Sequence, residues 1–153
     1  MESDKPKDGR ISSIVEPTKA ALEIEATIGF NCVAKNTMVI HPSEMFMLYG
    51  LGSLIVVKSV DGAKDRYLRG HSARVNYIDV SKQGNIFASG ECLEPAIADT
   101  AALIVWDFQS AQILYRVRFH KQVVMALSFN CEGRLLGSVG GAKDGNQLVI
   151  WNM

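Results

Sequence analysis

The stretch Leu103–Asp107 (LIVWD) returns further along the chain as Leu148–Asn152 (LVIWN). Each copy follows a short apolar segment that contains a serine, Ser89 before the first copy and Ser138 before the second. The two serines lie 49 residues apart. Similarity at a fixed period of this size is typical of repeated structural units that stack against one another. The repeat therefore decides the fold class.

A histidine precedes each copy, and its spacing supports the same period. His71 and His120 lie 49 residues apart, whereas Trp106 and Trp151 lie 45 residues apart. The difference falls within Glu91–Thr100, the connection between the second and third strands that we expect in the earlier copy. Loop lengths vary more readily than strand spacings.

A third, degenerate copy lies upstream. Aligning Leu54–Val57 with the first tryptophan strand places Val57 at the position of the tryptophan, with Lys58 in place of the aspartate that follows it. Val57 precedes His71 by 14 residues, the same distance that separates Trp106 from His120. The sequence therefore contains two well-formed copies and one degenerate copy.

Short apolar segments cut by turn residues predict an all-β fold, with no helical periodicity. Leu22–Ile28 alternates apolar and polar residues and is typical of a half-buried strand, whereas residues 1–20 lack periodicity and predict a disordered tail. Further strands are predicted at Thr37–Ile40, Met45–Tyr49, Leu54–Val60, Arg74–Val80, Ile86–Ser89, Leu103–Phe108, Gln112–Phe119, Val123–Phe129, Leu135–Val139 and Leu148–Trp151.

These motifs resemble the WD-repeat family, whose repeats form the four-stranded blades of a β-propeller. The resemblance implies that a histidine, serine, aspartate and tryptophan of each blade form one hydrogen-bonded network. The implied structural residues are His71, Ser89, Asp99, Trp106 and Asp107 in one blade, and His120, Ser138, Asp144 and Trp151 in the next. The assignment of Asp99 as the partner of His71 has an alternative, because the long turn that contains Asp99 could supply another residue for that role.

The resemblance also implies a domain organisation. We expect a tail at 1–20 and a partial propeller at 21–153, made of about two and three-quarter blades in an incomplete ring. Its parts are a closing strand at 21–31, a degenerate blade at 32–70, a blade at 71–119 and an incomplete blade at 120–153. Closed propellers have at least about four blades, so we expect missing sequence or another chain to complete the ring.

Three apparent catalytic or binding motifs have simpler interpretations. His71, Ser89 and Asp99 would suit a hydrolase, but the same set recurs in the next repeat, whereas catalysis needs a single assembled site. Gly140–Gly145 lacks the Gly-Lys-Ser/Thr ending of a phosphate loop and leads into a strand. His41 has no second metal ligand nearby and is interpreted as a turn residue. We predict no catalytic, metal or cofactor site.

One long turn remains open to two interpretations. Glu91, Glu94 and Pro95 are expected on an exposed loop after the second strand of the best-formed repeat. They form either a partner-contact site or an insertion that the fold tolerates.

Charge and cysteine usage limit the classes of partner. The 16 basic and 16 acidic residues balance, so no net field favours nucleic acid or an anionic membrane. From the charged first ten residues we expect no secretory signal, and no segment reaches the roughly 20 apolar residues that span a bilayer. Cys32, Cys92 and Cys131 lack metal-site spacing and are expected as reduced, mostly buried thiols.

The order and spacing of the motifs resemble a family of two-propeller WD-repeat proteins attached to the inner wall of axonemal doublet microtubules. The resemblance covers about 22–153. It implies a non-enzymatic structural scaffold in the cytoskeleton of motile cilia or flagella, with tubulin and other doublet-microtubule proteins as partners. The alternative is a generic cytoplasmic WD-repeat scaffold, for example a subunit of a ligase or signalling complex.

Overall fold

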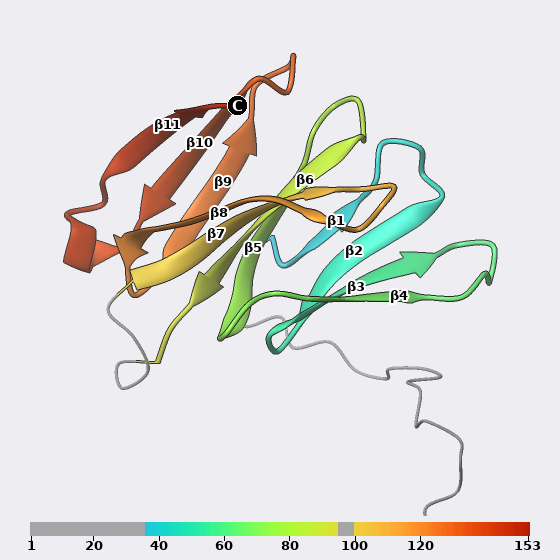
Figure 1. Cartoon of the computed structure of the whole chain (residues 1–153), viewed down its shortest axis with the longest axis horizontal. Helices are drawn as coiled ribbons and strands as arrows, with labels where there is room; N and C mark the ends of the chain where they lie inside the picture. The colour runs from blue at the N-terminus through green and yellow to red at the C-terminus, as the bar shows by residue number, and fades with distance from the viewer. Residues whose placement is uncertain (1–35, 95–99) are drawn as a thin grey trace, which may run out of the picture.

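The computed structural model describes residues 36–94 and 100–153, and these residues form three antiparallel sheets placed side by side (Figure 1). The predicted all-β class is confirmed. The predicted strand at 22–28 and the tail at 1–20 lie outside the described residues. In the described part of the chain, no helix is long and apolar enough to cross a membrane.

Each sheet is a meander in which every strand pairs with the one that precedes it. The first sheet has the order β1-β2-β3-β4, the second β5-β6-β7-β8, and the third β9-β10-β11. The strands are β1 (Met38–Ile40), β2 (Phe46–Leu51), β3 (Leu54–Ser59), β4 (Arg66–Arg69), β5 (Arg74–Val80), β6 (Ile86–Cys92), β7 (Thr100–Asp107), β8 (Ile113–Lys121), β9 (Val124–Phe129), β10 (Leu135–Gly140) and β11 (Leu148–Asn152).

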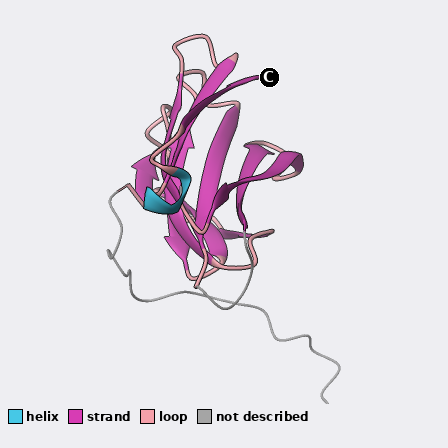
Figure 2. Cartoon of the chain, turned by 90° about the vertical axis from the view of Figure 1, so that its left-hand side faces the viewer, coloured by secondary structure: helices cyan, strands magenta, loops and turns pink. Residues whose placement is uncertain are grey.

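Four elements differ from the sequence prediction. β4 was not predicted, because its sequence Arg-Tyr-Leu-Arg shows no apolar alternation. β6 runs to Cys92 and β7 begins at Thr100, so both are longer than expected. β8 continues past the expected blade boundary at 119. β10 and β11 pair as an antiparallel hairpin, and their connection contains the short helix η1 (Ala142–Asp144), on the side of the third sheet (Figure 2).

The apolar core lies in two layers, one on each face of the second sheet. Between the first and second sheets, the ring of Trp106 stacks on that of Phe87 with centroids 5.9 Å apart. The buried residues of this layer are Leu48, Ile55, Val57, Leu68, Val75, Ile78, Phe87, Ala102, Ile104 and Trp106. Between the second and third sheets they are Ala73, Ala88, Leu93, Ala101, Leu103, Val105, Val124, Leu127 and Leu136. The second sheet is thus packed on both faces.

Hydrogen bonds also join neighbouring sheets. The backbone amide of Val75 donates to the carbonyl of Gly52 at 2.8 Å, which links the second sheet to the first. The side chain of Asn76 donates to the carbonyl of Val124 at 3.0 Å, and Asp79 accepts from the amide of Phe129 at 2.8 Å. These bonds fix the sheets relative to one another in addition to the core contacts.

Equivalent turns in the second and third sheets share one backbone conformation. Gly84 has φ +76° in the β5–β6 turn, and Gly133 has φ +72° in the β9–β10 turn. Glycine adopts this left-handed conformation without steric cost, and a side chain there is strained. The repeat is therefore preserved in the turns as well as in the strands.

Candidate functional site

The second sheet contains a buried network centred on Ser89. The indole Nε1 of Trp106 donates to the hydroxyl of Ser89 at 2.8 Å, and Nε2 of His71 lies 2.7 Å from the same oxygen. Ser89 is fully buried and Trp106 is 1% exposed. Because the indole N–H is only a donor, Ser89 accepts from it and can donate to the imidazole. The structure therefore brings together three of the residues that the repeat singled out.

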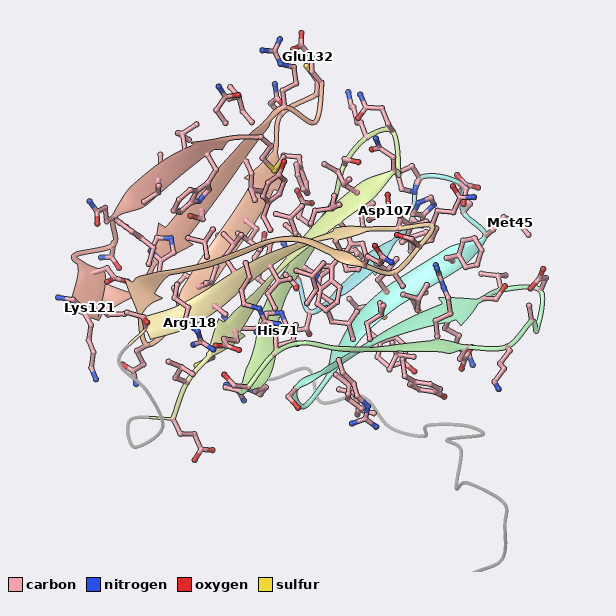
Figure 3. All side chains as sticks on the ribbon, in the orientation of Figure 1. Met45, His71, Asp107, Arg118, Lys121 and Glu132 are labelled. Atoms are coloured by element: carbon pink, nitrogen blue, oxygen red, sulfur yellow. The ribbon has the colours of Figure 1, made fainter. Side chains whose placement is uncertain are left out.

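The second nitrogen of the same imidazole faces Glu91. Nδ1 of His71 lies 3.1 Å from Oε2 of Glu91, and that carboxylate also accepts from the backbone amides of Ser72 at 3.0 Å and Ala102 at 2.9 Å. Nη1 of Arg118 lies 3.4 Å from Oε1. Figure 3 shows His71 and Arg118 close together beside the second sheet.

These contacts keep Glu91 ionised although it is completely buried. Burial raises the pKa of Glu91, but the hydrogen bonds from His71 and the amide of Ala102, together with the charge of His71 when it is protonated, lower it to about 2. An ionised carboxylate only accepts hydrogen bonds, so Nδ1 of His71 carries the proton. Each buried polar atom of this pair is thus satisfied.

The expected exposed position of Glu91 was wrong. Glu91 belongs to β6, where it pairs with Val75 of β5, because the strand continues past Gly90 instead of turning there. Of the residues grouped with it, Glu94 is exposed and Pro95 lies outside the described residues. Asp99, the expected acidic partner of His71, also lies outside them.

The third sheet repeats this arrangement with a weaker acidic contact. Nε2 of His120 lies 2.7 Å from the hydroxyl of Ser138, which accepts from Nε1 of Trp151 at 2.8 Å. Nδ1 of His120 lies 3.6 Å from Oδ2 of Asp144, beyond hydrogen-bond distance, and has no hydrogen bond to any described residue. Asp144 instead accepts from the amide of Lys121 at 2.8 and 2.9 Å. Burial lowers the pKa of His120, and Asp144 offsets part of that effect.

The first sheet has no such network, because Val57 occupies the position of the tryptophan. Its histidine, His41, connects sheets instead: Nε2 lies 2.8 Å from the carbonyl of Gly84, and its ring stacks on Phe108 with centroids 4.0 Å apart. The side chain is 7% exposed. The predicted turn residue therefore also joins the first and second sheets.

Two further residues differ from their expected surroundings. Asp107, grouped with the buried network by resemblance, accepts from the amide and hydroxyl of Ser110 at 2.7 and 2.6 Å and so closes the β7–β8 turn. Cys131 was expected to be buried, but it is exposed in the β9–β10 turn, while Cys92 is half-buried. Cys32 lies outside the described residues.

The chemistry available to the buried network is limited by access. The contacts run from serine to histidine to carboxylate, as in a hydrolase triad, through Ser89, His71 and Glu91. However, Ser89 has no exposed surface, and its oxygen accepts a hydrogen bond from Trp106. A nucleophile must reach its substrate, so this serine cannot attack one. Among the described residues, no group of three or more histidine, cysteine, aspartate or glutamate side chains is placed to hold a metal ion. The network therefore holds the sheet together.

Comparison with known proteins places the chain. No family model matches it. It is 37% identical over 133 residues to cilia- and flagella-associated protein 52 of Chlamydomonas reinhardtii, and 32% identical over 146 residues to the human protein of that name. These alignments cover 86% and 95% of this chain but 21% and 23% of the relatives. WD repeat-containing protein 90 of mouse is 28% identical over 149 residues, which cover 94% of this chain and 8% of that protein.

The fold is also matched by a solved structure. The WD40 repeats of RRP9 superpose with a TM-score of 0.64 at 22% identity, over 78% of this chain and 36% of that one. At this identity the likeness shows the fold alone. The chain spans about a fifth of the length of the ciliary relatives it matches. It is a WD-repeat protein with the fold of a partial β-propeller, related to cilia- and flagella-associated protein 52.

Proposed function

We propose that the chain is a structural scaffold of motile cilia or flagella that binds tubulin and neighbouring proteins on the inner wall of axonemal doublet microtubules. The observation that carries this proposal is the 37% identity to cilia- and flagella-associated protein 52 of Chlamydomonas reinhardtii over 86% of the chain. The similarity extends to the mouse, pig and cattle proteins of the same name, at 32% to 33% identity.

The distribution of polar groups supports a binding role over a catalytic one. The buried histidines, serines and carboxylates of the second and third sheets hydrogen-bond mainly within their own sheets. Partners must therefore contact the turns and the outward faces of the sheets. Rigid sheets that present loops in this way are how propellers bind other proteins.

Exposed apolar side chains support protein contacts at particular places. Among residues 36–94 and 100–153, twelve large apolar residues are at least 38% exposed, and none of them lies on β5, β6 or β7. They are Met38, Ile40, Met45, Val60, Ile113, Leu114, Tyr115, Phe119, Met125, Leu135, Leu148 and Ile150. Exposed apolar side chains on the outer strands and turns, with none on the central strands β5–β7, are consistent with contacts to a protein neighbour.

The alternative function is a generic cytoplasmic WD-repeat scaffold. The match to WD repeat-containing protein 90 favours it, since the name of that relative specifies only the repeat. The two functions differ in where the protein is held. An axonemal scaffold is part of an insoluble assembly, whereas a cytoplasmic scaffold is released when the cell is opened.

Fractionation of flagella separates the two functions. Flagella from the source organism are demembranated, the axonemes are washed with high salt, and the protein is followed with an antibody to this chain. The proposal expects it to remain with the salt-washed doublets together with tubulin. Recovery of nearly all of it in the detergent-soluble fraction would favour the cytoplasmic scaffold. A soluble flagellar protein measured in the same fractions controls for incomplete extraction.

A further inference from the structure

A groove lies where the first and second sheets meet. It is at the end of the sheets that carries the turns from each odd-numbered strand to the next even-numbered strand. In a meander, the β1–β2, β3–β4, β5–β6 and β7–β8 turns all lie at the same end, to which Met45 and Asp107 belong in Figure 3. Residues of the β3–β4, β5–β6 and β7–β8 turns, together with Phe46 at the start of β2, line a groove of about 580 Å³. That volume is within the range of sites that bind small ligands or peptide side chains.

The floor of the groove is an arginine held against two aromatic rings. Cζ of Arg66 lies 4.8 Å from the ring centroid of Phe108 and 5.9 Å from that of Phe46. Its Nη1 donates to the carbonyls of Phe108 at 2.8 Å and Gln109 at 3.2 Å. Since both of these bonds use Nη1, the Nε and Nη2 edge of the guanidinium is not used by them. A guanidinium fixed in this way is well suited to hold a carboxylate through two parallel bonds.

The remaining polar lining favours an anion over a cation. Lys64 adds a second positive charge at an exposed position. The one acidic residue that lines the groove, Asp107, has its carboxylate engaged by Ser110. Asn85 accepts from the hydroxyl of Ser81 through Oδ1, which leaves its amide protons as the groups it can offer to a ligand.

The walls add an apolar contribution. Phe46, Ala63 and Phe108 line the groove, and the ring of His41 stacks on that of Phe108. Arg66 is half-buried, so its cation has lost part of its water shell, and burial lowers its pKa. A cation in such surroundings gains more from a carboxylate than one in open solvent does.

We propose that this groove binds an acidic segment of a partner protein, with a carboxylate on Arg66 and a neighbouring apolar side chain against Phe46 and Phe108. The proposal specifies the chemistry of one binding partner. It rests on the proposed function only in expecting that partner in the axoneme. The binding itself is measured with purified protein and a synthetic peptide. A failure of that measurement is therefore distinguishable from a failure of axonemal retention.

The test uses the full 153-residue chain and a fluorescein-labelled heptapeptide, Gly-Glu-Glu-Phe-Glu-Glu-Gly, followed by fluorescence anisotropy. A matched peptide with glutamine in place of each glutamate should bind at least about tenfold more weakly, since it lacks the charge. Arg66→Met should weaken binding of the acidic peptide by about tenfold or more, and Arg66→Lys by less, because lysine keeps the charge but cannot form the two-bond contact.

Two further variants keep the test decisive. Arg134 lies in the β9–β10 turn at the same end of the third sheet, so Arg134→Met removes an equal charge outside the groove and should change affinity less than about twofold. Arg66 also contacts the second sheet, so its variants are compared with wild type by urea unfolding. Lys64→Gln alters an exposed lining residue without touching the core and should weaken binding about two- to threefold.

Several outcomes would overturn the proposal. If the glutamine peptide bound as tightly as the glutamate peptide, the groove would not recognise carboxylates. Equal weakening by Arg134→Met and Arg66→Met would assign the binding to diffuse charge. Displacement of the peptide by inorganic phosphate at a few millimolar would assign the groove to a free anion. Unchanged affinity in a folded Arg66→Met protein would remove the arginine from the site.

Discussion

The second and third sheets hold the same serine, histidine and tryptophan in nearly the same geometry, and they differ at the other imidazole nitrogen. In the second sheet, Nδ1 of His71 lies 3.1 Å from a carboxylate that also receives two backbone amides. In the third sheet, Nδ1 of His120 is buried 3.6 Å from Asp144 and has no hydrogen bond to a described residue. The first network is closed by hydrogen bonds and the second is not.

The position of the acid along the chain explains the difference. Glu91 stands on a strand, and the amide of Ala102 on the neighbouring strand β7 donates directly to it. Asp144 stands on η1 beyond the end of β10, and its carboxylate is engaged by the amide of Lys121. A buried polar atom without a partner costs about 1–3 kcal/mol. We therefore expect the second sheet to withstand unfolding better than the third.

The largest expected effect is that of Glu91→Ala. The change leaves His71 and the amide of Ala102 without their buried acceptor. Each buried donor left without an acceptor costs about 1–3 kcal/mol, which for these two donors amounts to about 2–6 kcal/mol. The free energy of unfolding, measured with urea and intrinsic tryptophan fluorescence, should fall by about that amount.

Two control variants locate this effect. Glu94→Ala removes the nearest exposed carboxylate of the same segment and should change stability by less than about 0.5 kcal/mol. Asp99→Ala tests the acid expected from the resemblance. If Asp99→Ala proves as costly as Glu91→Ala, the assignment of Glu91 as the partner of His71 is wrong.

The next effect compares the two serines. Ser89→Ala strips a hydrogen bond from both His71 and Trp106, which are buried, and should cost about 2–3 kcal/mol. Ser138→Ala removes the matching bonds, but Trp151 is only half-buried and its indole N–H can be hydrated, so the cost should be about 1 kcal/mol. Equal losses in urea unfolding would contradict the difference between the sheets.

A smaller effect separates the two histidine networks by pH. Because burial lowers the pKa of His120 below its ordinary 6.5, the unfolded chain binds this proton first, and stability should fall as the pH drops below 6.5. The lowered pKa of Glu91 acts in a different window: its contribution is complete above about pH 4.5 and is lost as the pH falls towards 2. Urea midpoints measured from pH 8 to pH 5 should therefore decrease less in His120→Gln than in wild type. An identical decrease would exclude His120 as the source.

The smallest expected effect is that of Asp107→Asn, which gives the second sheet the Trp-Asn pair of the third. Asp107 closes an exposed turn through Ser110, and an asparagine oxygen can accept the same two bonds. The urea midpoint should move less than it does in Ser138→Ala. A loss as large as that of Ser89→Ala would mean that Asp107 belongs to the buried network after all.

The features that the sequence predicted best are those that recur in each repeat. The class of the fold depends on spacings that recur, and recurrence distinguishes a structural position from an accidental one. The contacts of His71, Ser89 and Trp106 were implied by the resemblance to WD repeats. The same reasoning did not identify the strand β4, since its sequence Arg-Tyr-Leu-Arg has no apolar alternation. The first sheet keeps the meander although it has lost the tryptophan and the serine network.

The role of Glu91 was not predicted, because the difference in length between the two copies was assigned to Glu91–Thr100. The acid was therefore expected on the loop after the second strand. In the structure, a Cβ at Gly90 would lie 2.4 Å from Cβ of Val124, so the glycine permits the third sheet to approach β6. A close approach between sheets depends on residues more than 30 positions away. The Arg66 groove was missed for the same reason, since its lining comes from three separate turns and the start of β2.

The meander order of the sheets has a consequence for how the chain reaches its structure. Every strand ladder joins strands that follow one another directly, so each sheet can form from one continuous stretch. Contacts between residues close in sequence lose little chain entropy and form early. The first sheet can therefore assemble while the third is still being synthesised, and each completed sheet offers the next a surface on which to fold.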